Sequence, residues 1–527
     1  MRFPLWESHF AFGAPVETSA IVGYYEHINR CDEGVSNMAE WPQAGGPDGN
    51  WTTRERAPHR WSVADNRNIL FKTELPETGQ SGIAKYGDRL YFTTMEPLRN
   101  ARSRKDGGNV VGYAADAKTG ELLWSIDLPA KEESPYAYGF SDSSTPTPVT
   151  NGTHVWFTNS SGHIVCCTAD GSVVWRRTWD PTTGRPFNKQ YEPILHGNTL
   201  LSVEPRDPRD PSRQTDAWNH LRGIDAKTGK TLWVSDDGLT HYNTPVLGKT
   251  HNGTPAVMIG RGGHHDVPEG PSGLSLVSLA KGSEGKSLWK ADLPGKALYN
   301  MHWNRDRAYW LDEDTGTHRV LDSRTGKEVA VHKLGENATV RNYDKASKRY
   351  VTEQNVNIKA KGFRVFPAWF SNTVVGDWHW FLCFSSIRAE YGGGPVGPLY
   401  SVGRVNTKTG ATEYLELPTA PGIYGTNIEA RTINSRGIDV ASDTRSKRDG
   451  WYWCFIGSPV VAGGAIYWTM MNGTTYVING HARILDERAI LGVNDLGAVG
   501  GTWSLNTPTP VDGKLYHRTM TQLICIG

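Results

Sequence analysis

The chain has 527 residues, and its 56 Lys and Arg against 55 Asp and Glu give a net charge of +1. This balance argues against a nucleic-acid-binding protein, which would carry a basic excess. The sequence contains no run of 18 apolar residues, so no membrane-spanning helix is predicted. Glycine, at 58 residues, and tryptophan, at 20, are both abundant. The glycine content predicts many turns, and the tryptophan count suggests a repeated structural use of that residue.

The N-terminal region, residues 1–68, is expected to form an extension that packs on the main domain through its Phe, Tyr and Trp side chains. Its first residues, MRFPLWESHFAFGAPVETSA, lack a basic segment followed by an apolar core, so they do not read as a secretory signal peptide. The main domain is expected to span residues 69–527.

A short phrase recurs along the main domain. It reads AADAKTGELLW at 114–124 and GIDAKTGKTLW at 223–233. Weaker copies occur at 168–175, 281–289, 322–326 and 406–410. Four copies carry a Trp four residues after the turn glycine, at Trp124, Trp175, Trp233 and Trp289. Because this spacing follows the repeat, we interpret these tryptophans as packing residues and the glycines as turn residues with positive φ.

A second phrase precedes each copy. It begins with S/T-P and continues through a turn into an aromatic-rich strand, as in TPTPVTNGTHVWFTNSSG at 145–162. Apolar and polar residues alternate between N-G, G-G or D-G turns, which is typical of strands. A unit of four short antiparallel strands that recurs at roughly 40–60 residues is typical of propeller blades. The sequence therefore predicts an all-β, eight-bladed β-propeller whose first strands begin near Gly82, Thr145, Glu192, Thr244, Met301, Pro367, Ser458 and Thr507.

The eighth unit is short and lacks a fourth strand. The segment ILFKTEL at 69–75 has the character of an outer strand and precedes the first complete unit. We expect it to pair beside residues 523–526 and close the ring, because closure removes unpaired sheet edges.

The repeats resemble those of pyrroloquinoline-quinone-like, or quinoprotein-like, propellers, in which A-x-D-x-x-T-G-x-x-x-W is a tryptophan-docking motif between blades. Residues 114–124 match this motif throughout, and 223–233 differ only at Gly223. WPQAGGPDGNW at 41–51 and the ending LYHRTMTQLICIG are also similar to this superfamily. The resemblance implies the fold and a periplasmic or secreted location, whereas one fold hosts many functions.

Cys166 and Cys167 form an adjacent pair within HIVCCTADG. In quinoprotein alcohol dehydrogenases, which the resemblance brings in, adjacent cysteines form a disulfide beside the quinone. Here the pair falls within the third predicted strand of blade two, where successive side chains point to opposite faces. We therefore expect two reduced packing residues.

Loop lengths separate the two faces of the predicted ring. The long insertions are loops between second and third strands and links between blades, which share one face. They lie at 95–109, 128–143, 205–220, 262–273, 335–366, 386–398 and 418–456. Because function concentrates on loops held by a rigid scaffold, we expect a ligand site on this face, at the mouth of the central channel.

Chemistry-capable side chains gather on these loops near blades four and five. We expect His241, Tyr242, Arg261, His264 and His302 to approach one another there, with His241, Tyr242, His264 and His302 as the catalytic candidates. The ligand-binding candidates are Arg261, His265, Asp266, Trp303, Arg388 and Tyr391. Such side chains suit an anionic or sugar-like ligand, and imidazoles can move a proton near neutral pH. No HxH or HExxH spacing occurs, so no metal site is predicted.

Three functions are compatible with these observations. The favoured hypothesis is a site that binds, or binds and cleaves, a carbohydrate or another polar or anionic small molecule, with lyase- or hydrolase-type chemistry in the second case. The alternatives are a quinone- and calcium-dependent alcohol or sugar dehydrogenase, implied by the resemblance, and a non-enzymatic scaffold for protein partners. The long polar insertions favour the first over the scaffold. The lack of recognisable quinone and calcium ligands favours it over the dehydrogenase.

Overall fold

The computed structural model describes residues 40–97, 108–131, 142–181, 191–205, 218–240, 243–263, 267–344, 346–347, 349–358, 367–384, 400–417, 457–470, 473–497, 502 and 504–527. All of them lie in the compact unit Ala39–Gly527, and the unit Met1–Met38 lies outside the described residues. The described residues are strands and turns, with a 3-10 turn, η4, at Glu487–Ala489. Among them, no helix is long and apolar enough to cross a membrane.

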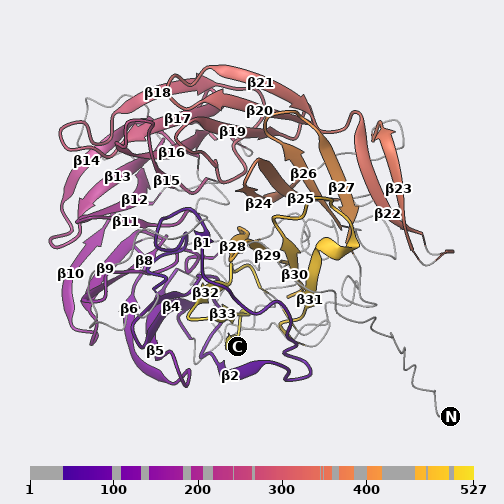
Figure 1. Ribbon diagram of the computed structural model, residues 1–527. Coiled ribbons are helices and arrows are strands. Elements are labelled where there is room, and N and C mark those ends of the chain that lie inside the picture. The colour runs from indigo at the N-terminus through magenta and orange to yellow at the C-terminus, as the bar shows by residue number, and fades with distance from the viewer. Residues whose placement is uncertain are drawn as a thin grey trace, which may run out of the picture. The chain divides into compact units, whose positions relative to one another are not determined.

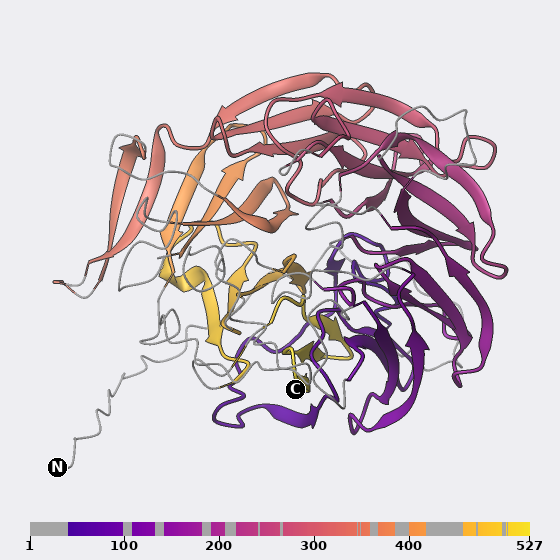
Figure 2. The ribbon, with the colours of Figure 1, turned by 180° about the vertical axis from the view of Figure 1, so that it is seen from behind.

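The strands form eight sheets arranged around a central channel as an eight-bladed β-propeller (Figures 1 and 2). Within each of the first four blades the chain runs antiparallel from the inner strand to the outer one. These blades are β3 (Ala84–Tyr86), β4 (Arg89–Met95), β5 (Val110–Asp116) and β6 (Leu122–Leu128); β7 (Val149–Thr150), β8 (His154–Asn159), β9 (His163–Thr168) and β10 (Val173–Thr178); β11 (Ile194–His196), β12 (Thr199–Pro205), β13 (Asn219–Asp225) and β14 (Thr231–Gly238); and β15 (Val246–Lys249), β16 (Pro255–Arg261), β17 (Gly273–Ser278) and β18 (Ser287–Asp292).

The last four blades vary this plan. In blade five, an isolated bridge between Trp303 and Ala308 takes the place of an inner strand. Blade six carries an additional hairpin, and an extra short strand joins blade seven. The strands are β19 (Arg307–Asp312), β20 (Thr317–Asp322) and β21 (Glu328–Lys333); β24 (Pro367–Val375), β25 (Trp378–Phe384), β26 (Tyr400–Asn406) and β27 (Thr412–Glu416) with the hairpin β22 (Ala338–Asp344) and β23 (Arg349–Val356); β28 (Val460–Ala462), β29 (Ala465–Thr469), β30 (Thr475–Asn479) and β31 (Ile490–Asn494) with β1 (Thr52–Thr53); and β32 (Thr509–Val511), β33 (Lys514–Arg518) and β34 (Gln522–Ile526) with β2 (Ile69–Glu74).

The ring closes through its two ends, as predicted. β2 pairs antiparallel with β34, in a register that places Thr73 opposite Leu523 and Lys72 opposite Ile524. The alternating burial of β2 follows from this position, because one face packs on the blade and the other faces solvent. The N-terminal strand therefore supplies the outer strand that the C-terminal blade lacks.

Neighbouring blades dock through one aromatic ring laid over one turn glycine. A Cβ at Gly171 would lie 2.9 Å from the indole of Trp124, and one at Gly326 would lie 2.5 Å from that of Trp289. The indole Nε1 of Trp289 also donates to Ser323 O at 2.7 Å. These glycines have positive φ, so they provide both the turn and the space for the ring. The interpretation of the repeated tryptophans as packing residues is confirmed.

Cys166 and Cys167 are free, buried thiols on β9. Cys167 packs with Tyr91 and Phe157 toward blade one, whereas Cys166 packs with Leu200 toward blade three. The two side chains therefore lie on opposite faces of the sheet, as predicted for reduced packing residues.

The link 335–366, which the sequence placed among the loops, contains the hairpin β22–β23. β22 pairs in parallel with β27 and so covers the outer edge of blade six. An ion network holds the hairpin in place: Glu413 on β27 accepts from Arg404 Nε at 2.7 Å and from Arg341 Nη1 on β22 at 3.1 Å. The strand pattern of this link was overlooked because it has no counterpart in the other repeats.

Residues 41–53 lie along the inner edges of several blades. Trp41 exchanges two backbone hydrogen bonds with Lys85 of β3, at 2.8 and 2.9 Å. Pro42 O accepts from β7 in blade two, and Gly49 O accepts from β15 in blade four. β1 then pairs in parallel with β28 in blade seven. We call residues 41–53 the channel segment, because it connects inner edges that the blades themselves leave apart. The domain boundary at residue 68 stays a prediction.

Candidate functional site

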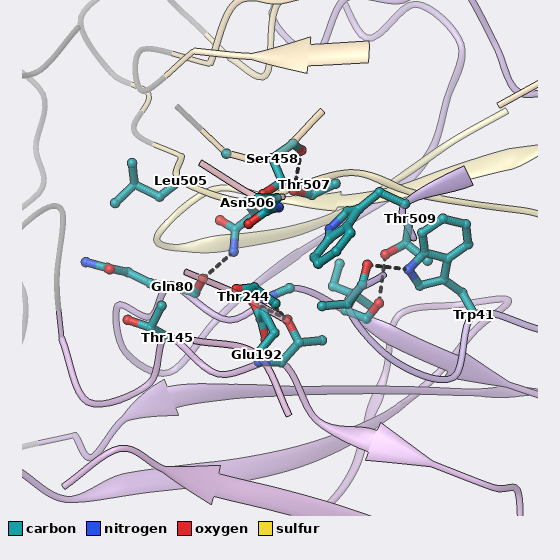
Figure 3. A pocket seen from close by; sticks show the side chains of 17 residues that line it. Trp41, Gln80, Thr145, Glu192, Thr244, Ser458, Leu505, Asn506, Thr507 and Thr509 are labelled. Atoms are coloured by element: carbon teal, nitrogen blue, oxygen red, sulfur yellow. Dashed lines mark hydrogen bonds between the residues drawn. The ribbon is translucent and has the colours of Figure 1, made fainter. Parts of the chain in front are cut away.

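A cavity of about 100 Å³ lies in the central channel, beside the channel segment. Most of its wall comes from the residues that begin the inner strands of successive blades (Figure 3). Trp41 lies at one end of it, while Gln80 and Leu505 lie toward the other. The lining residues are Trp41, Ala44, Trp51, Gln80, Gly82, Ile83, Thr145, Thr147, Glu192, Thr244, Asn300, Gly457, Ser458, Leu505, Asn506, Thr507 and Thr509.

The repeated S/T-P phrase explains why these residues share one level of the channel. In blades two, four, seven and eight the phrase ends the incoming link and starts the inner strand, as at Thr147 before β7 and Ser458 before β28. All links arrive on the same face, so the pseudo-symmetric ring brings these hydroxyl side chains together. The cavity thus lies toward the face with the long insertions, the end of the channel at which the sequence predicts a site.

The channel segment provides the aromatic part of the wall. Trp51 is 3% exposed and has a φ of 58°, a left-handed conformation that is unusual for a bulky residue. Its ring packs in a cluster with Ala44, Val246 and Trp303. The surrounding blades therefore hold Trp51 in a strained conformation, as is common where a side chain must be presented to a site.

Glu192 is the one carboxylate among the described side chains that line the cavity. Its Oε2 accepts from Thr147 N at 2.6 Å and its Oε1 accepts from Thr147 Oγ1 at 3.0 Å. Thr147 Oγ1 in turn accepts from Gly82 N at 3.0 Å, so one chain of hydrogen bonds joins blades one, two and three. Burial raises the pKa of Glu192 to about 8 against the lowering effect of these hydrogen bonds. The carboxyl is therefore mostly protonated at neutral pH and adds an O–H donor to the wall.

Asn300 supplies an acceptor to the same cavity. Its Nδ2 donates to Ser458 Oγ at 2.7 Å, which orients the amide. Its Oδ1 is buried and has no hydrogen-bond partner among the described residues. A buried amide oxygen without a partner is costly, about 1–3 kcal/mol. A ligand that donates a hydrogen bond to this oxygen would remove that cost, which favours binding of a donor in the cavity.

The described wall does not fit the cofactor that the resemblance implies. Pyrroloquinoline quinone is a carboxylate-bearing molecule that is expected to need cationic partners, and the described lining contains no Lys, Arg or His. No group of three or more His, Cys, Asp or Glu in the described part of the chain could hold a metal ion.

Arg261, a predicted ligand-binding residue, is 2% exposed at the end of β16. Its guanidinium donates to Pro271 O at 2.5 Å, to Ala291 O at 3.1 Å and to Asp292 Oδ1 at 2.9 Å. These partners belong to blade four and the loop before β17, so the observed contacts tie the blade's outer strands together.

His302 and Trp303, the other described candidates, lie next to each other in the chain but pack in different directions. His302 Nε2 lies 3.0 Å from Asn372 O on β24, toward blade six. Trp303 Nε1 donates to Val246 O on β15 at 2.8 Å, toward blade four. Neither residue shares a hydrogen-bond partner with Arg261 among the contacts of the described residues.

The remaining candidates lie outside the described residues, so the predicted cluster stays a prediction. They are His241, Tyr242, His264, His265, Asp266, Arg388 and Tyr391.

Sequence reasoning missed Glu192 and Asn300 as lining residues. It searched the long loops, whereas these side chains stand at the starts of inner strands. The signal was available in the repeat: where the second, fourth, seventh and eighth units have Ser or Thr before a proline, the third has Glu192.

A family model described as outer membrane protein assembly factor BamB matches residues 106–263. No curated protein sequence matches the chain significantly.

Solved structures of propellers resemble it along most of its length. Quinohemoprotein alcohol dehydrogenase from Comamonas testosteroni has a TM-score of 0.50 at 12% identity, with 93% of this chain and 81% of that chain covered. BamB from Moraxella catarrhalis has a TM-score of 0.44 at 13% identity, with 87% and 97% covered. A europium-containing methanol dehydrogenase has a TM-score of 0.47 at 13% identity, with 93% and 89% covered.

At these identities the likeness shows the fold and not the activity. The docking motif, the eight closed blades and the matched family region agree with one another. The chain is an eight-bladed β-propeller, and its residues 106–263 carry repeats of the pyrroloquinoline-quinone-like type.

Proposed function

We propose that the protein binds a small, uncharged polar ligand of the sugar or polyol class in the channel cavity. The observation that carries the proposal is the unpartnered Oδ1 of Asn300, buried in a wall that also holds the Glu192 carboxyl. An acceptor and a neutral donor, together with threonine and serine hydroxyls, match the alternating donors and acceptors of a polyol.

The charge and the apolar surface of the wall support this ligand class over an anion. The described lining offers no cation to an anionic ligand, and the carboxyl of Glu192 is neutral near pH 7 because burial raises its pKa to about 8. Trp41 and Trp51 add indole surface, which suits the apolar faces of a sugar ring. No comparable observation among the described residues supports the dehydrogenase or the scaffold alternative.

Binding can be tested with a panel of neutral sugars and polyols and their carboxylated counterparts, first by thermal shift and then by titration calorimetry. We expect neutral compounds to bind more tightly than their acids. Asn300→Ala should weaken binding roughly tenfold, because it removes a buried acceptor, whereas Glu192→Gln should bind like the wild type at pH 7 because Gln is also neutral. Incubation of each bound compound, followed by mass spectrometry, tests for cleavage.

The pH dependence of binding separates the two side chains. Raising the pH from 7 to 9 should weaken binding by the wild type, because Glu192 loses its proton, but not by Glu192→Gln. Glu121→Gln, an exposed change on a turn of blade one, is the matched control. The proposal is wrong if the acids bind more tightly than the neutral compounds, or if Asn300→Ala binds as the wild type does.

A further inference from the structure

The interface between blades five and six departs from the docking rule of its neighbours. Ala330 on β21 stands four residues after Gly326, where blades one to four have a Trp. His332, two residues further on, lies over the turn glycine of blade six instead, and a Cβ at Gly410 would lie 2.5 Å from its Nδ1. An imidazole therefore covers the position that an indole covers at Gly171, Gly229, Gly285 and Gly326.

Three more imidazoles are buried in the same interface. His302, His318 and His379 are 8%, 0% and 1% exposed. His318 Nε2 lies 3.0 Å from His379 Nδ1, and His379 Nε2 lies 2.9 Å from Asn372 Oδ1. The backbone oxygen of Asn372 accepts from His302 Nε2 at 3.0 Å. Asn372 on β24 of blade six thus bonds to His302 through its backbone and to the His318–His379 pair through its side chain.

These hydrogen bonds favour the neutral forms of His318 and His379. Because Asn372 Oδ1 is an acceptor, His379 carries its proton on Nε2 and accepts at Nδ1. His318 must then donate from Nε2, which leaves His318 Nδ1 as a buried acceptor without a partner among the described residues. A proton added to His379 would face the N–H of His318, and one added to His318 would have no acceptor.

Among the described residues, no carboxylate acts on the His302, His318 or His379 ring to stabilise an imidazolium. Tyr309 on β19 stacks on His318 with ring centroids 5.8 Å apart. His332 on β21 also stacks on His318, with ring centroids 5.7 Å apart. Tyr309 also contacts His379, at 5.5 Å, and His302 lies 6.2 Å from that ring. Two nearby charged groups, Arg307 and Asp377, shift the pKa of Tyr309 and not those of these three imidazoles. Asp377 is itself paired with Lys408 Nζ at 2.9 Å.

We propose that the interface between blades five and six is an acid-sensitive joint, which opens reversibly when its buried histidines take up protons while blades one to three stay folded. Burial lowers the pKa of His318 to about 3, that of His302 to about 4 and that of His379 well below its usual value. The open interface would return these pKa values toward 6.5. The open form then binds more protons, so acid favours it progressively as the pH falls below 6.5.

Hydrogen exchange measured by mass spectrometry on the full chain tests the joint directly. Protection is corrected for intrinsic exchange rates and compared at pH 7.0, 5.5 and 4.5, then again after return to pH 7.0. We expect peptides from β20 and β25 to lose protection about tenfold at pH 4.5. Peptides from β5 and β13 should change less than about twofold, and neutralisation should restore the loss.

Two variants assign the effect to the histidines. His318→Gln keeps a donor near the Nε2 position and His379→Asn keeps an acceptor near the Nδ1 position, and neither new side chain titrates; each should reduce the acid loss in β20 and β25. His517→Gln is the matched control, because His517 is buried in another interface, with Nε2 2.9 Å from Thr469 Oγ1. It should leave the acid response of β20 and β25 unchanged.

The proposal fails if β20 and β25 of the wild type lose protection no earlier than β5 and β13. It also fails if both variants keep the wild-type acid response, or if His517→Gln removes that response.

Discussion

The carboxyl of Glu192 couples the channel cavity to the stability of the fold. Burial raises its pKa from 4.5 to about 8, so the folded protein holds a proton that the unfolded chain releases. A group of this kind contributes stability that is fully present below pH 4.5 and is lost as the pH rises through 8. The pH window of the effect therefore runs from about 4.5 to about 8.

Glu192→Gln should remove this dependence, because the amide keeps the shape and does not titrate. Between pH 5 and 9 the free energy of unfolding of the wild type should fall by roughly 2–4 kcal/mol more than that of the variant. Urea denaturation at pH 5, 7 and 9 measures the difference, with Glu121→Gln as the control. Equal pH slopes for wild type and Glu192→Gln would contradict the assignment.

The two thiols of β9 give a second test at this scale. Burial raises the pKa of Cys166 to about 12 and that of Cys167 to about 11, so little thiolate forms near neutral pH. We expect neither thiol to react with a maleimide in the folded protein at pH 7, and both to react after denaturation without a reductant. Peptide mass mapping distinguishes them from the other cysteines. A peptide two mass units lighter, with no reaction until reduction, would show a disulfide instead.

At the scale of elements, the docking tryptophans carry a large share of the contact between blades. Trp289→Ala should lower the free energy of unfolding by roughly 3–5 kcal/mol, because a ring that is 9% exposed leaves a cavity over Gly326. Leu288→Ala is the matched control: the neighbouring side chain is 47% exposed, and its loss should change stability by about 0.5 kcal/mol or less. Denaturant midpoints measure both. Equal effects would mean that the ring is not a docking element.

The elements also show how far the sequence could be read. The fold could be predicted because the same turn and Trp recur. The copies that end at Trp124 and Trp233 each mark one blade, and the distance between copies indicates the length of the repeat. Features that occur once escape this reasoning. Among the described blades, the hairpin β22–β23 and the imidazole of His332 over its turn glycine, Gly410, each occur once. For a related reason, Glu192 could not be predicted as a site residue from its local sequence. Its position in the cavity wall depends on the closure of the whole ring.

For the whole molecule, closure makes the first strand and the last one interdependent. Replacing residues 69–75 by a Gly/Ser segment of equal length should lower the melting temperature of the entire ring, because β34 loses its partner and becomes an open edge. Leu70→Ser is the control, since Leu70 on β2 is 55% exposed and its change leaves the strand intact. Calorimetry of both proteins checks the expectation. A melting temperature unchanged by the replacement would show that closure does not stabilise the ring.

The channel segment has a consequence for the time course of folding. It leaves the ribosome before any blade, yet β1 finds its partner, β28, only when the seventh blade has been made. Contacts between such distant parts of a chain form late, because loop closure must precede them. Until the fourth and fifth blades have been made, Trp51 lacks its neighbours Val246 and Trp303, so the nascent chain exposes this indole while the first blades are synthesised. Folding should therefore end with the arrival of the last blades around this segment, and chaperones that recognise exposed aromatic residues have their longest opportunity at the N-terminus.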